Sequence, residues 1–147
     1  MRILFDTNIL ARAHQGANGP ARRALLGAAA RGTETLIVSQ YLLQELGRVL
    51  TYPKLLKHSR LTSVDVAEYL EYLAGISVLV DPLPVPAHIL RDRTDEPILG
   101  TALAGKADVL CTLDADFFDE NVRQFSVTKG IRILTDVELL HAFGIGR

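Results

Sequence analysis

The sequence contains a single cysteine and no run of uncharged apolar residues long enough to cross a membrane. One thiol cannot form an internal disulfide, so the disulfide framework of small secreted domains is excluded and a reducing cytoplasm is the expected location. Cys111 closes the apolar run Val109–Cys111, which favours a small buried hydrophobe over a nucleophile. The apolar stretch after Met1 and Arg2 ends at Asp6, so no signal peptide is expected.

Acids are scarce in the first half of the chain. Residues 1–64 carry nine Lys or Arg and three acids, which is a net charge of +6. Residues 65–147 carry seven Lys or Arg and fourteen acids, which is a net charge of −7. The two halves together give the net charge of −1. Between Glu45 and Asp65 there are only basic charges, among them Arg48, Lys54 and Lys57. An ordinary solvated face and a patch that binds a polyanion such as RNA are both compatible with this pattern.

Length and composition predict one domain that spans residues 1–147, because 147 residues with 48% apolar content can form a substantial core. Short apolar runs alternate with stretches of helical periodicity. Strands are expected at 2–5, 36–38, 76–80, 109–112 and 131–134. Helices are expected at 21–31, after Ser39 as far as Tyr52, at 62–73, after Pro97 and at 136–143. This alternation predicts a three-layer α/β/α fold with a central, mostly parallel sheet.

Two acids follow predicted strands directly. Asp6 comes after the apolar run Ile3–Phe5, and Asp114 comes after the strand at 109–112. The carboxyl ends of parallel strands meet at one edge of the sheet, where α/β proteins bind their ligands. Carboxylates gathered there repel one another unless a cation or a shared proton relieves the repulsion. We therefore expect a divalent metal site at this edge.

The other candidate acids are ambiguous when taken singly. Glu45 lies three residues after Leu42 and four before Val49, at the margin of the buried helical stripe. Asp95 precedes a helix that carries Pro97 in its first turn, so capping of backbone N–H groups alone would explain it. Capping or a turn also explains Asp116 and Asp114. Only the joint placement of all five acids favours metal binding over these roles.

The chemistry of the acids indicates which ion would bind. His14, His58, His88 and His141 lack the spacing of metal ligands, and the one cysteine adds no cluster. Mg²⁺ and Mn²⁺ are hard cations that prefer carboxylate and water oxygens. One or two such ions can activate water and stabilise charge on phosphorus, so the pattern is typical of phosphodiester hydrolysis.

Four motifs occur in one order along the chain. They are Asp6-Thr7-Asn8 after an apolar strand, Gln44-Glu45-Leu46, the segment 91–99 (RDRTDEPIL), and Thr112-Leu113-Asp114-Ala115-Asp116. Together they resemble the PIN-domain family of metal-dependent ribonucleases, in particular the branch of toxin components of toxin–antitoxin pairs. The segments 39–46, 52–55 and 130–135 also look like that branch. The resemblance implies a PIN-like three-layer fold.

The resemblance also implies a site, a cofactor and partners. The acidic quartet would be Asp6, Glu45, Asp95 and Asp114, with Asp116 as an accessory metal ligand. The residues that orient the carboxylates or a bound water would be Thr7, Asn8, Ser39 and Thr112. The RNA backbone would be held by Arg48, Lys54 and Lys57. The family implies Mg²⁺ or Mn²⁺, RNA cleavage that leaves 5′-phosphate and 3′-hydroxyl ends, a cognate antitoxin and a homodimer.

One departure from the family concerns Asp95. Many relatives have a run similar to Asp-Pro-Asp-Asp-Asp where this chain reads Asp92-Arg93-Thr94-Asp95-Glu96. Thr94 stands where an acid is common, so Glu96 or Asp92 could replace Asp95 as the ligand.

Three other functions remain open from the sequence. An aspartyl phosphatase would use Asp6 as a nucleophile, but Asn8 two residues later cannot serve as its general acid. A receiver-like signalling domain would bind Mg²⁺ without hydrolysis, and a non-catalytic module would keep the fold only to bind RNA or protein. Tyr41, Tyr52, Tyr69 and Tyr72 are expected in the core or at an interface, and Tyr52 also has basic neighbours that would suit base stacking.

Overall fold

The computed structural model describes residues 1–144 and contains one sheet of five parallel strands. The strands are β1 (Arg2–Phe5), β2 (Thr35–Val38), β3 (Ser77–Leu79), β4 (Val109–Cys111) and β5 (Arg132–Leu134). Their order across the sheet is β3-β2-β1-β4-β5, so β1 lies at the centre, between β2 and β4. The predicted α/β fold is confirmed, and the sheet is entirely parallel.

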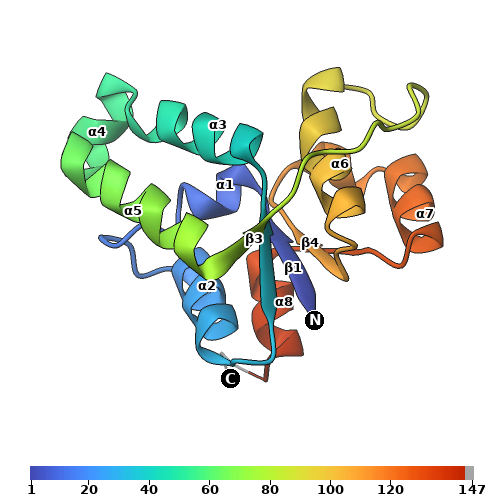
Figure 1. Ribbon diagram of the computed structural model, residues 1–147, viewed down its shortest axis with the longest axis horizontal. Coiled ribbons are helices and arrows are strands. Elements are labelled where there is room, and N and C mark those ends of the chain that lie inside the picture. Colours follow the sequence, from blue (N-terminus) through green and yellow to red (C-terminus); the bar gives the residue numbers. More distant parts are fainter. Residues whose placement is uncertain (145–147) are drawn as a thin grey trace.

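Helices cover both faces of the sheet (Figure 1). The α-helices are α1 (Thr7–Leu10), α2 (Pro20–Ala30), α3 (Gln40–Leu50), α4 (Pro53–Ser59), α5 (Ser63–Ile76), α6 (Glu96–Ala104), α7 (Glu120–Thr128) and α8 (Asp136–Ala142). Two 3₁₀ turns precede α6 and α7, η1 (Arg93–Asp95) and η2 (Ala115–Phe118). Helices α6 and α7 lie on one side of the sheet, whereas α1, α2, α3 and α5 lie on the other, where α2 packs against α8.

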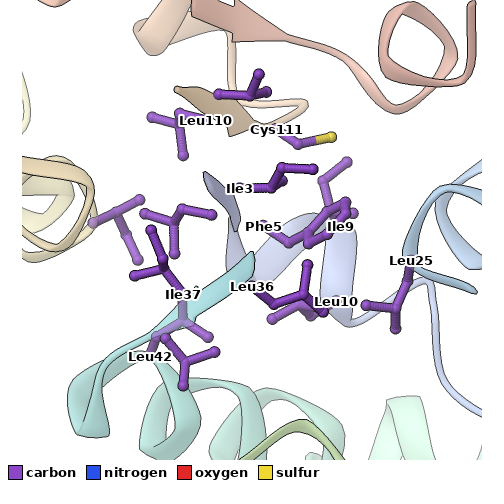
Figure 2. Close-up of a cluster of buried hydrophobic side chains, with 14 of the residues drawn as sticks. Ile3, Phe5, Ile9, Leu10, Leu25, Leu36, Ile37, Leu42, Leu110 and Cys111 are labelled. Carbon is purple, nitrogen blue, oxygen red and sulfur yellow. The ribbon is translucent and has the colours of Figure 1, made fainter. Parts of the chain in front are cut away.

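The core is formed by the strands and the inward faces of the helices (Figure 2). Ile3 and Leu4 of β1, Ile37 of β2 and Leu110 of β4 are almost fully buried, as expected for strands covered on both faces. Leu42 and Leu46 of α3 recur at helical spacing and are also fully buried. This packing fixes β1 and α3 relative to each other, and both carry acids of the candidate site.

The structure differs from the sequence expectations in three additional short helices and at the end of one predicted helix. Helices α1, α4 and α7 were not predicted. Pro53 follows the end of α3 as predicted but also begins α4, because proline is well suited to a first helical turn. The helix expected at 62–73 is α5, which continues to Ile76. The start of α5 follows the predicted pattern, because the Thr62 hydroxyl and the Asp65 carboxylate form a capping box. Among residues 1–144, no helix combines the length and apolar character needed to span a membrane.

Candidate metal centre

The centre of the site is the edge of the sheet where β1 and β4 end. The chain leaves β1 at Asp6, which is buried and caps α1. Its Oδ1 accepts a 2.7 Å hydrogen bond from the backbone N–H of Thr7. Its Oδ2 accepts hydrogen bonds from the Thr112 hydroxyl at 2.7 Å and from the Asn8 amide at 3.2 Å. These donors hold the carboxylate in one orientation at the mouth of the sheet.

Thr112 and Asn8 join the ends of the two central strands. The Thr112 hydroxyl, which is fully buried, accepts a 3.0 Å hydrogen bond from the backbone N–H of Asp114. The Asn8 side-chain oxygen accepts a 3.1 Å hydrogen bond from the backbone N–H of Leu113. Asp114 Oδ1 in turn accepts from the N–H of Asp116 at 3.0 Å. The loop that carries Asp114 is therefore bonded directly to the residues that hold Asp6.

Burial and charge act on Asp6 in the same direction. Desolvation is the largest influence and raises the pKa of its carboxyl group, and the nearby Asp114 carboxylate raises it further. The hydrogen bonds from Thr112, Thr7 and Asn8 oppose this shift without cancelling it. Among residues 1–144, no basic side chain forms an ion pair with Asp6, which is the condition expected of an anionic site that holds a cation.

Glu45 reaches the site from α3. The helix begins after Ser39, whose hydroxyl accepts a 3.2 Å hydrogen bond from the N–H of Leu42. Ser39 therefore caps α3, as its place in the sequence predicts, and it does not line the cleft described below. The Glu45 carboxylate is half-buried and forms an ion pair with Arg48, one turn further along α3. Arg48 is therefore paired with one of the predicted metal ligands.

Asp95 lies at the junction of η1 and α6, and its side chain does not cap the helix. Asp92 is the capping residue here, because its Oδ1 accepts a 2.9 Å hydrogen bond from the N–H of Thr94. The Asp95 Oδ2 atom is buried without a hydrogen-bond partner among the described residues. Desolvation, followed by the charge of Asp114 and the charges of Asp92, Asp116 and Asp6, raises the pKa of Asp95 to about 7. Capping consequently does not explain this acid.

A second group of acids adjoins the first. Oxygen atoms of Asp92, Asp95 and Asp116 all lie within 4.8 Å of one another, so Asp95 belongs both to this group and to the cleft. Asp92 is exposed, and Asp116 is half-buried. Asp116 does not line the cleft itself, and its accessory role stays a prediction.

These side chains line an open cleft of about 510 Å³. Its lining comprises Asp6, Thr7, Asn8, Ala11, Tyr41, Glu45, Arg48, Val49, Thr94, Asp95, Ile98 and Asp114. The four acids predicted from separate motifs, which are Asp6, Glu45, Asp95 and Asp114, therefore share one cavity. Lys54 and Lys57 are exposed on α4 and do not line it.

Tyr41 lines the cleft, a position that was not predicted from the sequence. Tyr69 is in the core, where its hydroxyl donates a 2.8 Å hydrogen bond to the carbonyl oxygen of Leu10. Tyr41, Tyr52 and Tyr72 are instead 38%, 58% and 39% exposed, so these three are not in the core, and an interface position stays a prediction for them. A signal was available for Tyr41: it precedes Glu45 by four residues, and side chains at that spacing share one helical face.

The donor set fits a hard divalent cation. Every side chain that could hold an ion here offers a carboxylate, hydroxyl or amide oxygen, which are the ligands of Mg²⁺ and Mn²⁺. The unpartnered buried Oδ2 of Asp95 supports this fit, because such an oxygen is costly unless a cation or a proton satisfies it.

Comparisons with known proteins agree with the fold and the motifs. A family profile described as PIN domain matches residues 2–116. No curated protein sequence matches the chain. Among solved structures, VapBC2 from Rickettsia felis, crystallised with a DNA fragment from its promoter, contains a chain with the same fold. The TM-score is 0.57 and the identity 16%, and the match covers 90% of this chain and 98% of that one.

Proposed function

This chain belongs to the PIN-domain family, and we propose that it is a metal-dependent endoribonuclease, the toxin of a toxin–antitoxin pair. PIN domains are generally nucleases, and nuclease chemistry requires an anionic pocket that can hold a hard cation against a phosphate group. The observation that carries the proposal is the convergence of Asp6, Glu45, Asp95 and Asp114 on one cleft from four distant parts of the chain.

The metal would be Mg²⁺ or Mn²⁺, held by Asp6, Glu45, Asp95 and Asp114, with Asp116 as an accessory ligand. The position of Asp92 beside Asp95 and Asp116 supports a supplementary role for Asp92 rather than a replacement of Asp95. When bound, such an ion polarises the phosphate and lowers the pKa of a coordinated water. Thr7, Asn8 and Thr112 keep Asp6 oriented by hydrogen bonds, which is the supporting role expected of residues behind metal ligands.

The proposed reaction is hydrolysis of an RNA phosphodiester. The oxygen of water attacks phosphorus while the bond from phosphorus to the 3′ oxygen breaks, which leaves a 5′-phosphate and a 3′-hydroxyl. The proton lost by the attacking water passes to solvent. The proton on the departing oxygen is supplied by solvent.

Basic side chains would hold the RNA backbone. Arg48 lines the cleft, and its guanidinium donates to Glu45. A cation at Glu45 would replace that pairing and release the guanidinium for a phosphate. Lys54 and Lys57 extend the basic surface beyond the cleft onto the exposed face of α4. These contacts are electrostatic and independent of RNA sequence.

The proposed partners are an antitoxin protein and a second copy of this chain, and the proposed location is the cytoplasm. The structural likeness to a chain of VapBC2, together with the toxin-like motifs, supports this proposal. A basic side chain of the antitoxin would be complementary to the acidic cleft, because it would neutralise the carboxylates that otherwise hold the metal.

The direct test is cleavage of RNA by the purified protein with Mg²⁺ or Mn²⁺. Asp6→Asn removes the buried charge and should lower the cleavage rate by more than about a hundredfold, beyond the loss typical of residues behind metal ligands. Asp81→Asn, in the loop after β3 and outside the cleft, is the matched control and should cleave normally. A phosphomonoester substrate tests the phosphatase alternative in parallel. Equal cleavage by Asp6→Asn and the native protein would overturn the proposal, as would phosphomonoester hydrolysis without RNA cleavage.

A further inference from the structure

One face of α3 extends the acidic cleft onto the surface of the protein. Tyr41, Gln44, Glu45 and Arg48 follow the spacing i, i+3, i+4 and i+7, so their side chains share one side of the helix. These four residues, which we name the α3 ledge, line a second cavity of about 440 Å³. Three of them, Tyr41, Glu45 and Arg48, also line the cleft of the metal centre. The two cavities therefore adjoin along α3.

Tyr41 is the aromatic residue of the ledge, and its ring is not packed in the hydrophobic core. Tyr69, in contrast, lies in that core, with a hydroxyl that bonds to the backbone of Leu10. Desolvation raises the pKa of the Tyr41 hydroxyl first, and the charges of Glu45, Asp95 and Asp6 raise it further. The phenol is thus close to the acids of the cleft and stays neutral. A neutral, partly exposed ring beside the proposed cleavage site is available to a ligand.

The chemistry of the ledge points to a nucleotide. An aromatic face stacks on any unpaired base, and a guanidinium binds phosphate through two parallel hydrogen bonds. The Gln44 amide is exposed next to them and can both donate and accept hydrogen bonds at a base edge. A peptide that binds through apolar side chains would find little apolar surface on the ledge, because three of its four residues are polar or charged.

We propose that the α3 ledge is a nucleotide-binding subsite, in which the ring of Tyr41 stacks on an unpaired base adjacent to the phosphate held in the cleft. The choice of RNA as the ligand of this subsite rests on the proposed nuclease function. Arg48 binds the phosphate between the cleft and the ledge. The base must be out of a double helix to reach the ring, so the substrate is single-stranded next to the cleaved bond.

The absence of tryptophan from the chain makes stacking directly measurable. Tyr41→Trp introduces a single tryptophan, and titration with single-stranded hexauridylate in an Asp6→Asn background avoids cleavage. We expect saturable fluorescence quenching, because a stacked base quenches an indole. Tyr72→Trp is the matched control, since Tyr72 is exposed to the same extent on α5 and lines another groove. Absence of quenching at position 41, or equal quenching at both positions, would overturn the subsite.

A second pair of variants keeps the test decisive if the tryptophan variant does not fold. Tyr41→Phe retains the ring and should bind hexauridylate as tightly as the native protein, whereas Tyr41→Ala should bind about tenfold more weakly. A stable RNA duplex of about 20 base pairs, whose bases are paired, should bind equally to all three proteins. Unchanged affinity of Tyr41→Ala, or a loss in Tyr41→Phe as large as in Tyr41→Ala, would refute stacking.

The two proposals can fail separately. If Asp6→Asn abolishes cleavage but the tyrosine variants bind alike, the nuclease assignment stands and the subsite is wrong. If the native protein does not cleave RNA but the position-41 pattern is observed, the subsite stands as an RNA-binding surface and the nuclease assignment is wrong.

Discussion

The hydroxyl of Thr112 donates a 2.7 Å hydrogen bond to Asp6 Oδ2 and accepts a 3.0 Å hydrogen bond from the backbone N–H of Asp114. One buried hydroxyl thus sets the positions of two acids that are more than a hundred residues apart in sequence and belong to neighbouring strands. Its loss would affect the stability of the fold and the geometry of the site together.

Thr112→Val tests this link, because valine keeps the shape of the side chain and removes only the hydroxyl. Two buried polar groups lose a partner, so the free energy of unfolding should fall by about 1–3 kcal/mol, measured by urea denaturation. The affinity for Mn²⁺, measured by calorimetry, should fall by about 10- to 100-fold. Thr101→Val is the control: Thr101 is equally buried, but its hydroxyl bonds to Pro97 of its own helix, so Mn²⁺ affinity should not change. Equal loss of metal affinity in both variants would contradict a specific role for Thr112.

The stability of the metal-free protein should depend on pH through Asp95. Its pKa in the folded protein, about 7, is above the ordinary value of 3.8, so the folded state binds this proton more tightly than the unfolded state does. The stability that Asp95 contributes is therefore complete below about pH 4 and is lost as the pH rises through about 7. With a chelator present, the melting temperature should fall between about pH 5 and pH 8, and the fall should be smaller in Asp95→Asn.

Addition of Mn²⁺ should reverse this trend. A cation that binds the ionised carboxylates stabilises the folded state, and it should raise the melting temperature more at about pH 8 than at about pH 5. Asp81→Asn serves as a control outside the cleft and should follow the native protein at every pH. A melting temperature that rises with pH in the absence of metal would contradict the assigned shift.

Gly100 allows α6, the helix that follows Asp95, to pack closely against the loop at Leu83. A Cβ at this position would overlap the carbonyl oxygen of Leu83, and the N–H of Leu83 also donates a 3.0 Å hydrogen bond to the Gly100 carbonyl. Gly100→Ala should therefore displace α6 or the loop and destabilise the protein by about 1–3 kcal/mol in urea denaturation. Gly75→Ala, in α5 with open space around its added Cβ, should be neutral or stabilising by up to about 1 kcal/mol. The same effect in both variants would rule out a steric cause at Gly100.

The two lysines of α4 should contribute to RNA binding through their charge alone. A Lys54→Ala and Lys57→Ala double variant should weaken RNA binding and should lower the slope of log affinity against log salt by about 1.4, the value for two contacts to single-stranded phosphates. Lys106→Ala with Lys129→Ala, two lysines that follow α6 and α7, is the charge-matched control and should leave the slope unchanged. An unchanged slope in the α4 variant would refute a phosphate contact there.

The sequence predicted the parts of the site that depend on regular structure. Asp6 and Asp114 follow strands, and parallel strands bring their carboxyl ends to one edge whatever the intervening chain does. Glu45 belongs to a helix with strong apolar periodicity, so its place at the margin of the buried stripe could be derived from Leu42 and Val49. Tertiary geometry was then needed only to show that these three acids line the same cleft.

The remaining parts depend on short or irregular elements. Helices α1 and α4 have four and seven residues, too few to show a period, and Pro53 indicated an end more strongly than a beginning. Asp95 occupies the N-cap position of α6 without a capping hydrogen bond from its side chain, because the 3₁₀ turn η1, which Asp92 caps, precedes the helix. The exposure of Tyr41 depends on the space left by neighbouring helices, which local sequence does not encode.

The central place of β1 has a consequence for the timing of synthesis. A ribosome making this chain completes β1 and Asp6 almost at once, and Glu45 soon after, but Thr112 and Asp114 emerge only when most of the polypeptide exists. Every shorter, unfinished product lacks one wall of the cleft. The cleft that holds the four acids can therefore form only in a chain whose translation has passed Asp114.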